Sequence, residues 1–374
     1  MTTELTETSA VDFLKAHGLV GDDEVRATRS LGGGVSNRVL QVETAADCYV
    51  LKQPLPNLAV EDDWPADVVR VHNEAAATRA YSRICETVPN AAVPSVLAES
   101  RDDHVVAFSC APDDAVMWKR DLLDGHVDVR VAETVGRILG AVHADAAGDD
   151  ELRAAFADET PFLQLRIEPY HRTTAERHPD VADPIEEEVE RILGVQRTLV
   201  HGDYSPKNVL VAPGETDRND GGPHGGDPDD ATPDDGGPAD GAADDGDGDG
   251  TPEAWILDFE VAHWGDPAFD TAFVLNHLFI KSVYNHERMA AYHEAARAFW
   301  TVYDERVPWD VERETVRELA ILMLARFDGK SPVEYVEREA VADALRSVAE
   351  HALTADVATL EGFRETVARE VEAL

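Results

Sequence analysis

A polar loop between two short apolar runs, near the middle of the chain, constrains the fold more than any other feature. The runs at 199–200 and 209–211 predict two buried strands, and the loop between them carries His201, Asp203 and Asn208. Another apolar pair, 256–257, predicts a strand that ends beside Asp258 and Glu260. Carboxylates at the mouth of buried strands are costly unless something binds them, so these residues predict a binding or catalytic site.

Phosphoryl transfer from ATP requires this set of side chains. Asp203 fits the catalytic base that orients an acceptor hydroxyl and takes its proton, and Asn208 and Asp258 fit ligands of Mg²⁺, which prefers hard oxygen donors. Glu260 could add a second contact to the metal. Lys207 could reach the γ-phosphate, although an exposed loop lysine is the alternative. Asp203 and Asn208 could also merely shape a turn, but that leaves Asp258 and Glu260 unexplained.

The first hundred residues carry candidates for binding the nucleotide. The segments 25–31, 38–42 and 49–53 predict three strands joined by tight turns. The first turn is glycine-rich, and its candidate cofactor-binding residues are Gly32, Gly33, Gly34, Ser36 and Asn37. Glycines there would let backbone N–H groups approach phosphates closely, although a plain hairpin turn is an equal alternative.

Lys52 lies in the third of these predicted strands and would point a cation into the cleft that the glycines cover. A buried lysine needs an acidic partner. Glu74 is the candidate, in a helix predicted from about residue 65 to 86, although Glu61 or Glu86 could compete with it.

Several side chains in the second half of the chain are candidates for holding the acceptor. The segment 162–172 contains Arg166, Tyr170 and Arg172, groups of the rigid or bidentate kind that fix a polyol or a charged substrate. Ordinary ion pairs on a solvated helix face are the alternative. Arg326 lies in a polar turn that breaks a helical pattern, and it could face the cleft or end an exposed helix.

Periodicity and composition divide the rest of the chain. A predicted amphipathic helix at 129–145 ends near His143, for which a packed core histidine is the favoured role. From residue 268 onward, helical patterns occur at 268–281, 286–303, 311–327, 333–346 and 355–373. The stretch 214–253 contains mainly Gly, Asp, Pro and Ala, which predicts a disordered insert at a hairpin tip.

The formal net charge is −42 in 374 residues, and lysine is scarce, with six lysines against 27 arginines. A surface of this kind repels nucleic-acid phosphates and anionic membranes, so we expect neither as a partner. Acid-rich, lysine-poor surfaces are typical of halophilic proteins, in which salt screens the self-repulsion. A cationic substrate remains an alternative on charge alone.

The three cysteines, Cys48, Cys85 and Cys110, lack the spacing of a zinc site or a disulfide framework and predict buried free thiols. No apolar run approaches 18 residues, and the first residues lack the basic and apolar regions of a signal peptide. We therefore expect a cytoplasmic protein, and the sequence leaves its oligomeric state open.

With these residues identified, the chain resembles the aminoglycoside-phosphotransferase and choline-kinase branch of the protein-kinase-like fold. The resemblance covers roughly residues 25–345 without the insert. It implies a two-lobed α+β fold, with a β-rich N-lobe at 1–110, a mainly helical C-lobe at 111–374, and ATP in the cleft between them. A connector at 111–114 would bond the adenine edge.

The resemblance also implies a role for individual residues. Lys52 would contact the α- and β-phosphates and Glu74 would orient it, while Asp203, Asn208 and Asp258 would act as assigned above. Glu260 matches the Asp-x-Glu form of the metal motif. His201 and Asp270 would be structural, with Asp270 bracing the catalytic loop after the turn 265–267.

Within this branch, the segments 52–56 and 63–65 resemble the small lobe of methylthioribose kinases. Two departures concern the acceptor. The residues after Asp203 are Tyr-Ser-Pro-Lys-Asn where those enzymes have Leu-His-Thr-Gly-Ser, and the adjacent arginine pair of their substrate pocket does not occur here.

The leading hypothesis is a Mg²⁺- and ATP-dependent kinase acting on a hydroxyl of a small metabolite, such as a sugar or a methylthioribose-like alcohol. The alternatives are an aminoglycoside- or choline-type phosphotransferase with a cationic substrate, or a nucleotide-binding module without catalysis. A protein kinase is disfavoured, because only 12 positions separate Asp258 from Asp270 and leave no room for a long activation segment.

Overall fold

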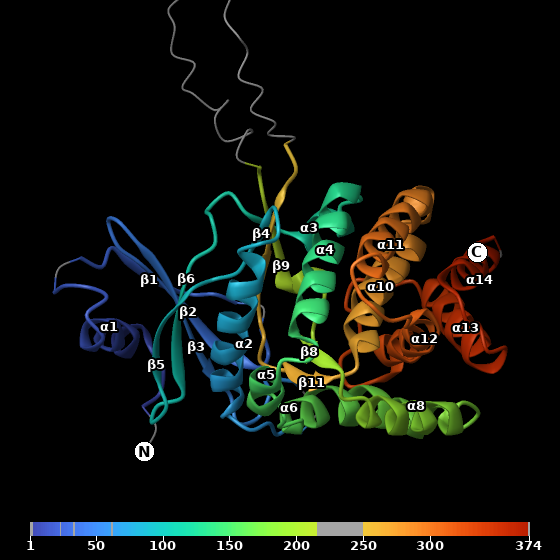
Figure 1. Cartoon of the computed structure of the whole chain (residues 1–374), viewed down its shortest axis with the longest axis horizontal. Helices are drawn as coiled ribbons and strands as arrows, with labels where there is room; N and C mark the ends of the chain where they lie inside the picture. Colours follow the sequence, from blue (N-terminus) through green and yellow to red (C-terminus); the bar gives the residue numbers. More distant parts are fainter. Residues whose placement is uncertain (1–2, 23, 33, 61–62, 215–249, 373–374) are drawn as a thin grey trace, which may run out of the picture.

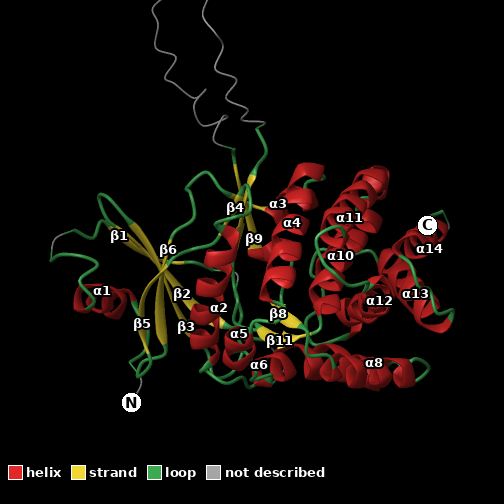
Figure 2. Ribbon diagram, in the orientation of Figure 1, coloured by secondary structure: helices red, strands yellow, loops and turns green. Residues whose placement is uncertain are grey.

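The computed structural model describes residues 3–22, 24–32, 34–60, 63–214 and 250–372. Two lobes lie side by side along the longest axis of the molecule, a β-rich lobe at the N-terminal end and a mainly helical lobe at the other (Figures 1 and 2). The predicted arrangement of a β-rich first lobe and a helical second lobe is therefore confirmed. Gly33, Glu61 and most of the predicted disordered insert, 215–249, lie outside the described residues.

The first lobe is built on a five-stranded antiparallel sheet in the order β1-β2-β3-β6-β5. Its strands are β1 (Ala27–Ser30), β2 (Asn37–Glu43), β3 (Cys48–Pro54), β5 (Val96–Ser100) and β6 (Val105–Ser109). Helix α1 (Glu7–Ala16) packs against one face through a small core that includes Leu51. Side chains alternate along a strand, so the next residue, Lys52, projects from the other face, toward α2 (Arg70–Cys85).

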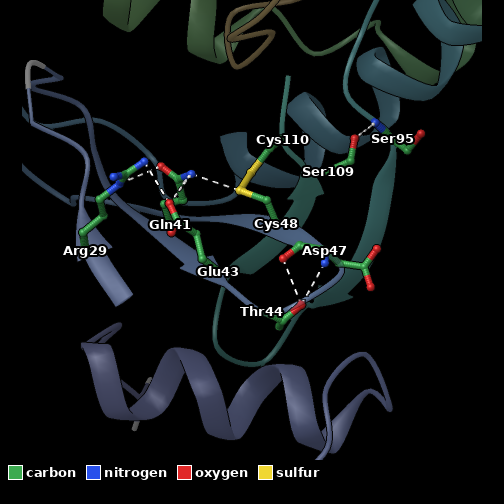
Figure 3. The surroundings of a disulfide bond; sticks show 9 residues. All are labelled: Arg29, Gln41, Glu43, Thr44, Asp47, Cys48, Ser95, Ser109 and Cys110. Atoms are coloured by element: carbon green, nitrogen blue, oxygen red, sulfur yellow. Dashed lines mark hydrogen bonds and ion pairs between the residues drawn. A yellow bond between two sulfur atoms is a disulfide. The ribbon is translucent and has the colours of Figure 1, made fainter. Parts of the chain in front are cut away.

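A disulfide joins Cys48, the first residue of β3, to Cys110, which directly follows β6 (Figure 3). The prediction of free thiols is therefore wrong for Cys48 and Cys110, whereas Cys85 is free and buried as predicted. The cause is strand register: Tyr49 pairs with Ser109 in the β3–β6 ladder, which places Cys48 and Cys110 opposite each other. Their separation of 62 positions in the sequence gives no sign of this proximity.

Short strands in the second lobe hold the polar loop that the sequence singled out. One sheet has the order β4-β10-β9-β7, and a two-stranded sheet pairs β11 with β8. Their bounds are β4 (Ala91–Ala92), β7 (Val116–Met117), β8 (Thr198–Val200), β9 (Val209–Ala212), β10 (Glu253–Ile256) and β11 (His263–Gly265). Because β9 pairs directly with β10, the loop after β8 and the residues after β10 emerge at the same edge.

Helices make up the rest of the second lobe, and α10 (Pro267–Tyr284) is buried along nearly its whole length. The other helices before it are α3 (Trp118–Leu123), α4 (Val129–Ala146), α5 (Asp150–Ala155), α6 (Thr160–Phe162), the π-helix η1 (Leu163–Arg172), α7 (Thr173–Arg177), α8 (Ala182–Gly194) and the 3-10 turn η2 (Pro206–Asn208). After it come η3 (His286–Arg288), α11 (Met289–Asp304), α12 (Glu312–Asp328), α13 (Glu339–Thr354) and α14 (Leu360–Val371).

Two of the predicted C-terminal helices start later than expected. The helix predicted at 333–346 begins only at Glu339, because the preceding segment folds back and Val333 N donates to Arg326 O. The one predicted at 355–373 begins at Leu360, where the side chain of Thr359 caps the helix by accepting from Gly362 N. None of the helices in the described ranges is long and apolar enough to cross a membrane.

Candidate active site

The loop between β8 and β9 is held by its own side chains and by the strands on either side. His201 is fully buried; its Nδ1 accepts from Asp203 N at 3.1 Å, so Nε2 carries the proton and donates to Leu257 O at 3.1 Å. Burial lowers the pKa of His201 and keeps it neutral. Gly202 has φ +76°, and a Cβ there would lie 2.7 Å from Val261 O, so only glycine fits.

Asp270, on the first turn of α10, ties this loop to the helical core. Its Oδ2 accepts from His201 N at 2.6 Å and its Oδ1 accepts from Gly202 N at 2.8 Å. His143 Nε2 donates to Oδ2 at 3.2 Å from the neighbouring helix α4. Burial alone would raise the pKa of Asp270, but these hydrogen bonds outweigh it and lower the pKa.

Asp203 lies at the centre of the loop and is 3% exposed. Its Oδ2 is contacted by Arg166 Nη2 at 3.0 Å, by Lys207 Nζ at 2.9 Å and by Asn208 Nδ2 at 2.9 Å. Burial would raise the pKa of Asp203, but the cations of Arg166 and Lys207 lower it below its usual range. The carboxylate is therefore ionised at neutral pH and ready to accept a hydrogen bond.

A charged triad joins the two lobes across the cleft. Lys52 Nζ lies 2.5 Å from Glu74 Oε1 on α2 and 2.9 Å from Asp258 Oδ1, which follows β10. Burial of Lys52 would lower its pKa, but the two carboxylates outweigh burial and raise the pKa. Asp258 adopts φ +69°, an unusual conformation for a residue with a side chain. Glu74 is thus the partner that the structure pairs with Lys52.

A cavity of about 330 Å³ opens beside this triad, between the lobes. Strands β2 and β3 form its roof with Val39 and Val50, and Leu210 and Leu257 form its floor. Cys110 of the disulfide and the connector residues 111–113 line its remaining side. Apolar walls with a connector backbone at one end and the charges of Lys52 and Asp258 at the other suit a planar base carrying a phosphate chain.

Glu260 holds the glycine-rich turn in place through a residue that the sequence analysis missed. Its Oε2 accepts from Asn37 Nδ2 at 2.9 Å and from Arg70 Nε at 3.0 Å. Arg70 is 1% exposed, and its Nη2 also donates to Ser36 O at 2.6 Å and to Leu55 O at 3.0 Å. An arginine one turn before Glu74 on the same helix was the available signal.

The described glycines of this turn are unusually free of structural constraint. Gly32 and Gly34 are both exposed, and a Cβ added at either would have no neighbour within 4 Å. Neither has a positive φ. Crowding and conformation therefore do not explain these glycines, whereas the close approach of a ligand to the backbone would.

The four candidate acceptor residues separate into two groups. Arg166 contacts Asp203, and its Nε donates to Gly202 O at 2.7 Å. Tyr170 lies beside it, with Arg166 Cζ 5.6 Å from the ring centroid and Arg326 Nη1 donating to the Tyr170 Oη at 3.1 Å. Arg172 instead forms an i,i+4 ion pair with Glu168 in which both side chains are about half exposed, which fits the alternative of an ordinary surface pair.

The sequence is similar over part of its length to curated methylthioribose kinases. The methylthioribose kinase of Bacillus mycoides is 26% identical over 141 residues, which are 37% of this chain and 34% of that protein. The methylthioribose kinase of Bacillus cereus is 24% identical over 240 residues, which are 57% of this chain and 59% of that protein. The chain thus spans between about a third and three-fifths of the length of these curated relatives.

One solved structure shares the fold at a TM-score of 0.50. A Ralstonia eutropha protein described as a candidate aminoglycoside phosphotransferase matches with a TM-score of 0.50 and 13% identity over 98% of each chain. Spectinomycin phosphotransferase, solved with ADP and spectinomycin, has a TM-score of 0.49 and 12% identity over 99% of both chains. The first of these likenesses confirms the predicted two-lobed, protein-kinase-like α+β architecture.

The profile of one family fits the sequence over the sheet of the first lobe and the catalytic loop. It is that of the phosphotransferase enzyme family, APH, and it matches residues 27–221, more than half of the chain. The chain therefore belongs to the phosphotransferase enzyme family.

Proposed function

We propose that this protein is a Mg²⁺- and ATP-dependent phosphotransferase acting on a hydroxyl of a small metabolite. The observation that carries the proposal is the triad of Lys52, Glu74 and Asp258, in which residues 206 positions apart lie within 2.9 Å of each other beside an apolar cavity. A lysine held between two carboxylates at the end of such a cavity suits the phosphates of a nucleotide and its metal. Because ATP is the donor, we place the enzyme in the cytoplasm.

The donor would lie with its base in the cavity and its phosphates toward the triad. Lys52 would contact the α- and β-phosphates, held in position by Glu74. The turn of Gly32, Gly34, Ser36 and Asn37 would cover the phosphates, fixed by the bonds from Arg70 and Glu260.

The residues present suit Mg²⁺. Asn208 Nδ2 donates to Asp203, which turns the amide oxygen Oδ1 away from that carboxylate and leaves it as the ligand atom. Asp258 supplies a carboxylate. Mg²⁺ is commonly bound through one or two protein oxygens and completed by phosphates and water, so this pair suffices. When bound, the metal would neutralise charge that develops on the phosphates. Glu260 would act mainly through Asn37 and Arg70, with a metal contact as the alternative role.

Asp203 would orient the acceptor hydroxyl and take its proton as the oxygen–phosphorus bond forms and ADP leaves. Its lowered pKa makes it a weak base, so proton transfer occurs late, as the hydroxyl becomes acidic on bonding to phosphorus. Lys207, whose side chain is 48% exposed and whose Nζ lies 2.9 Å from Asp203, is free to swing toward the transferred phosphoryl group.

Release of ADP from Mg-ATP, measured over a panel of sugars, sugar acids, amino alcohols and aminoglycosides, tests the proposal. Asp203→Asn is expected to lower kcat by about 10²- to 10⁴-fold while the affinity for Mg-ADP stays within about twofold. Full turnover by this variant would remove Asp203 as the base. Tight binding of Mg-ATP without transfer to any acceptor would favour the alternative of a non-catalytic nucleotide-binding module.

A further inference from the structure

Four cations from four separate elements of the second lobe lie close enough for their charges to act on a common set of neighbours. We call them the acceptor-side cluster: Lys119 of α3, Lys207 of η2, Lys281 of α10 and Arg326 of α12. Three of them are among only six lysines in a chain of net charge −42. Chance placement of a scarce residue does not explain this concentration.

Shared aromatic neighbours show how close the members are. Lys119 Nζ and Lys281 Nζ lie 5.9 and 5.2 Å from the ring centroid of the same residue, Tyr335. Arg326 Cζ lies 5.9 Å from the ring of Tyr170. Helix α3 also contacts the turn η2 that carries Lys207, and α10 packs beside α12 (Figure 1).

Two chains of contacts connect the cluster to the catalytic carboxylate. Lys207 Nζ binds Asp203 directly, at 2.9 Å. Arg326 bonds Tyr170, whose ring lies under the guanidinium of Arg166, and Arg166 binds Asp203 at 3.0 Å. A molecule whose hydroxyl reached Asp203 would therefore have these cations around its remaining atoms.

Helix α10 determines how far Lys281 lies from the catalytic loop. Asp270, Phe273, His277 and Lys281 follow one another at spacings of three and four residues and thus form one stripe. Ring contacts follow this stripe, since Phe273 lies 5.8 Å from His277. At 1.5 Å per residue, Lys281 lies about 16 Å along the helix from the residue that braces the catalytic loop.

The cluster lacks the acids that would normally accompany it. Within the described ranges, no ion pair to Lys119, Lys281 or Arg326 occurs; the exposed Glu334 acts on Lys119 through its charge without forming an ion pair. Lys281 is 0% exposed, and its Nζ makes one long hydrogen bond, to His277 O at 3.4 Å. Arg326 Nε is also buried without a hydrogen-bond partner in this part of the chain.

Burying a cation without a negatively charged partner raises the free energy of the folded protein. Burial, with Lys119 and Arg326 nearby, lowers the pKa of Lys281 well below its usual range. Any ligand that brought negative charge would remove this penalty, and it would restore the proton that the lysine gives up.

We propose that the acceptor carries an anionic group, a carboxylate or a phosphate, which Lys119, Lys281 and Arg326 bind while its hydroxyl reaches Asp203. This inference rests on the proposed phosphotransferase function and narrows its substrate class. It disfavours aminoglycosides and choline-like alcohols, whose positive charge the cluster would repel.

Matched acceptors test the proposal on the full chain with saturating Mg-ATP. The carboxylate arm compares D-glycerate with glycerol and ribonate with ribitol, the phosphate arm compares ribose 5-phosphate with ribose, and kanamycin is the cationic acceptor. We expect the anionic member of at least one pair to have the higher kcat/KM, by about 10- to 100-fold. The arm in which that preference appears identifies the anion. A preference for the neutral members or for kanamycin overturns the proposal.

Lys281→Met removes the charge at nearly constant volume and should erase the preference. In this variant we expect the anionic and neutral members to differ by less than about threefold, because KM for the anionic one rises. Lys15→Met, on α1 in the other lobe, is the matched control and should keep the preference. An unchanged preference in Lys281→Met contradicts the proposal.

A binding measurement separates this inference from the proposed function. Calorimetric titration of inorganic phosphate is done with the non-hydrolysable Mg-AMPPNP in the nucleotide site. We expect binding by the unaltered chain with uptake of a proton, and at least about tenfold weaker binding by Lys281→Met. Equal binding by both proteins, or none by either, overturns the anion site. Absence of turnover with every acceptor, together with Lys281-dependent binding, would instead overturn the transferase function alone.

Discussion

The cations on the two sides of the cleft differ in their partners. On the nucleotide side each buried cation has carboxylate partners: Lys52 has Glu74 and Asp258, and Arg70 has Glu260. On the acceptor side Lys281 and Arg326 contact aromatic rings and neutral oxygens instead.

This contrast indicates which side is complete before a ligand arrives. Paired charges hold their positions without help, so the nucleotide side is organised in advance, as efficient phosphoryl transfer requires. Unpaired cations raise the free energy of the empty site and lower it again when an anion binds. Substitutions on the two sides should therefore have opposite effects on the stability of the ligand-free protein.

The largest effect is expected on the nucleotide side, from Arg70→Met. This change leaves Glu260 as a buried carboxylate without its cation and releases Ser36 and Leu55. We expect the free energy of unfolding to fall by about 3–5 kcal/mol, measured by urea denaturation, with a weaker affinity for Mg-ADP.

Arg79→Met is the matched control, since Arg79 lies on the same helix and its side chain is 53% exposed beside Glu99. This substitution should lower the free energy of unfolding by about 1 kcal/mol or less. If neutralising the stranded carboxylate with Glu260→Gln in the Arg70→Met background recovers no stability, then lost packing, and not uncompensated charge, explains the cost.

A somewhat smaller effect is expected at the back of the nucleotide cavity. Replacing both Cys48 and Cys110 by serine removes the covalent link between β3 and the connector (Figure 3). We expect a loss of about 2–4 kcal/mol in the free energy of unfolding, because the 62-residue loop is no longer closed in the unfolded chain.

Dithiothreitol provides the internal control for this prediction. It should lower the melting temperature of the unaltered chain and leave that of the double serine variant unchanged. Three reactive thiols in the denatured, unreduced protein would show that the disulfide does not form.

Local sequence patterns predicted most of the candidate residues on the nucleotide side. The spacing of His201, Asp203 and Asn208 needs only one loop between two strands, and alternation along a strand places Lys52 on the face opposite Leu51. Its partner Glu74 followed from the need for an acid on the adjacent helix, and the structure pairs the two.

Contacts between distant segments explain what the sequence did not reveal. Arg70 meets Glu260 across 190 positions, and Cys48 meets Cys110 through strand register. The acceptor-side cluster combines residues from α3, η2, α10 and α12, so no single spacing records it. The scarcity of lysine was an available signal, because three of the six lysines lie in this cluster.

The smallest effect, and the one of opposite sign, is expected from Lys281→Met on the acceptor side. Methionine has no proton to lose on burial, so the ligand-free protein should be more stable at pH 7 by about 1–4 kcal/mol. The groups that face this lysine, His277, Tyr335, Lys119 and Arg326, offer it no negative charge at that pH.

The pH dependence of the free energy of unfolding shows whether the lysine's proton causes this difference in stability. The pKa of Lys281 is lowered in the folded chain, so between that lowered value and the unfolded value of about 10.4 the unfolded chain binds a proton that the folded chain does not. The stability of the unaltered protein should therefore rise with pH relative to Lys281→Met, by up to about 1.4 kcal/mol per unit between pH 7 and 10. In the same urea series, the free energy of unfolding of Lys15→Met should follow that of the unaltered protein at every pH.

A difference in this free energy between the unaltered protein and Lys281→Met that is constant with pH would mean that Lys281 is charged and already compensated in the empty site. The contrast between the two sides of the cleft would then disappear.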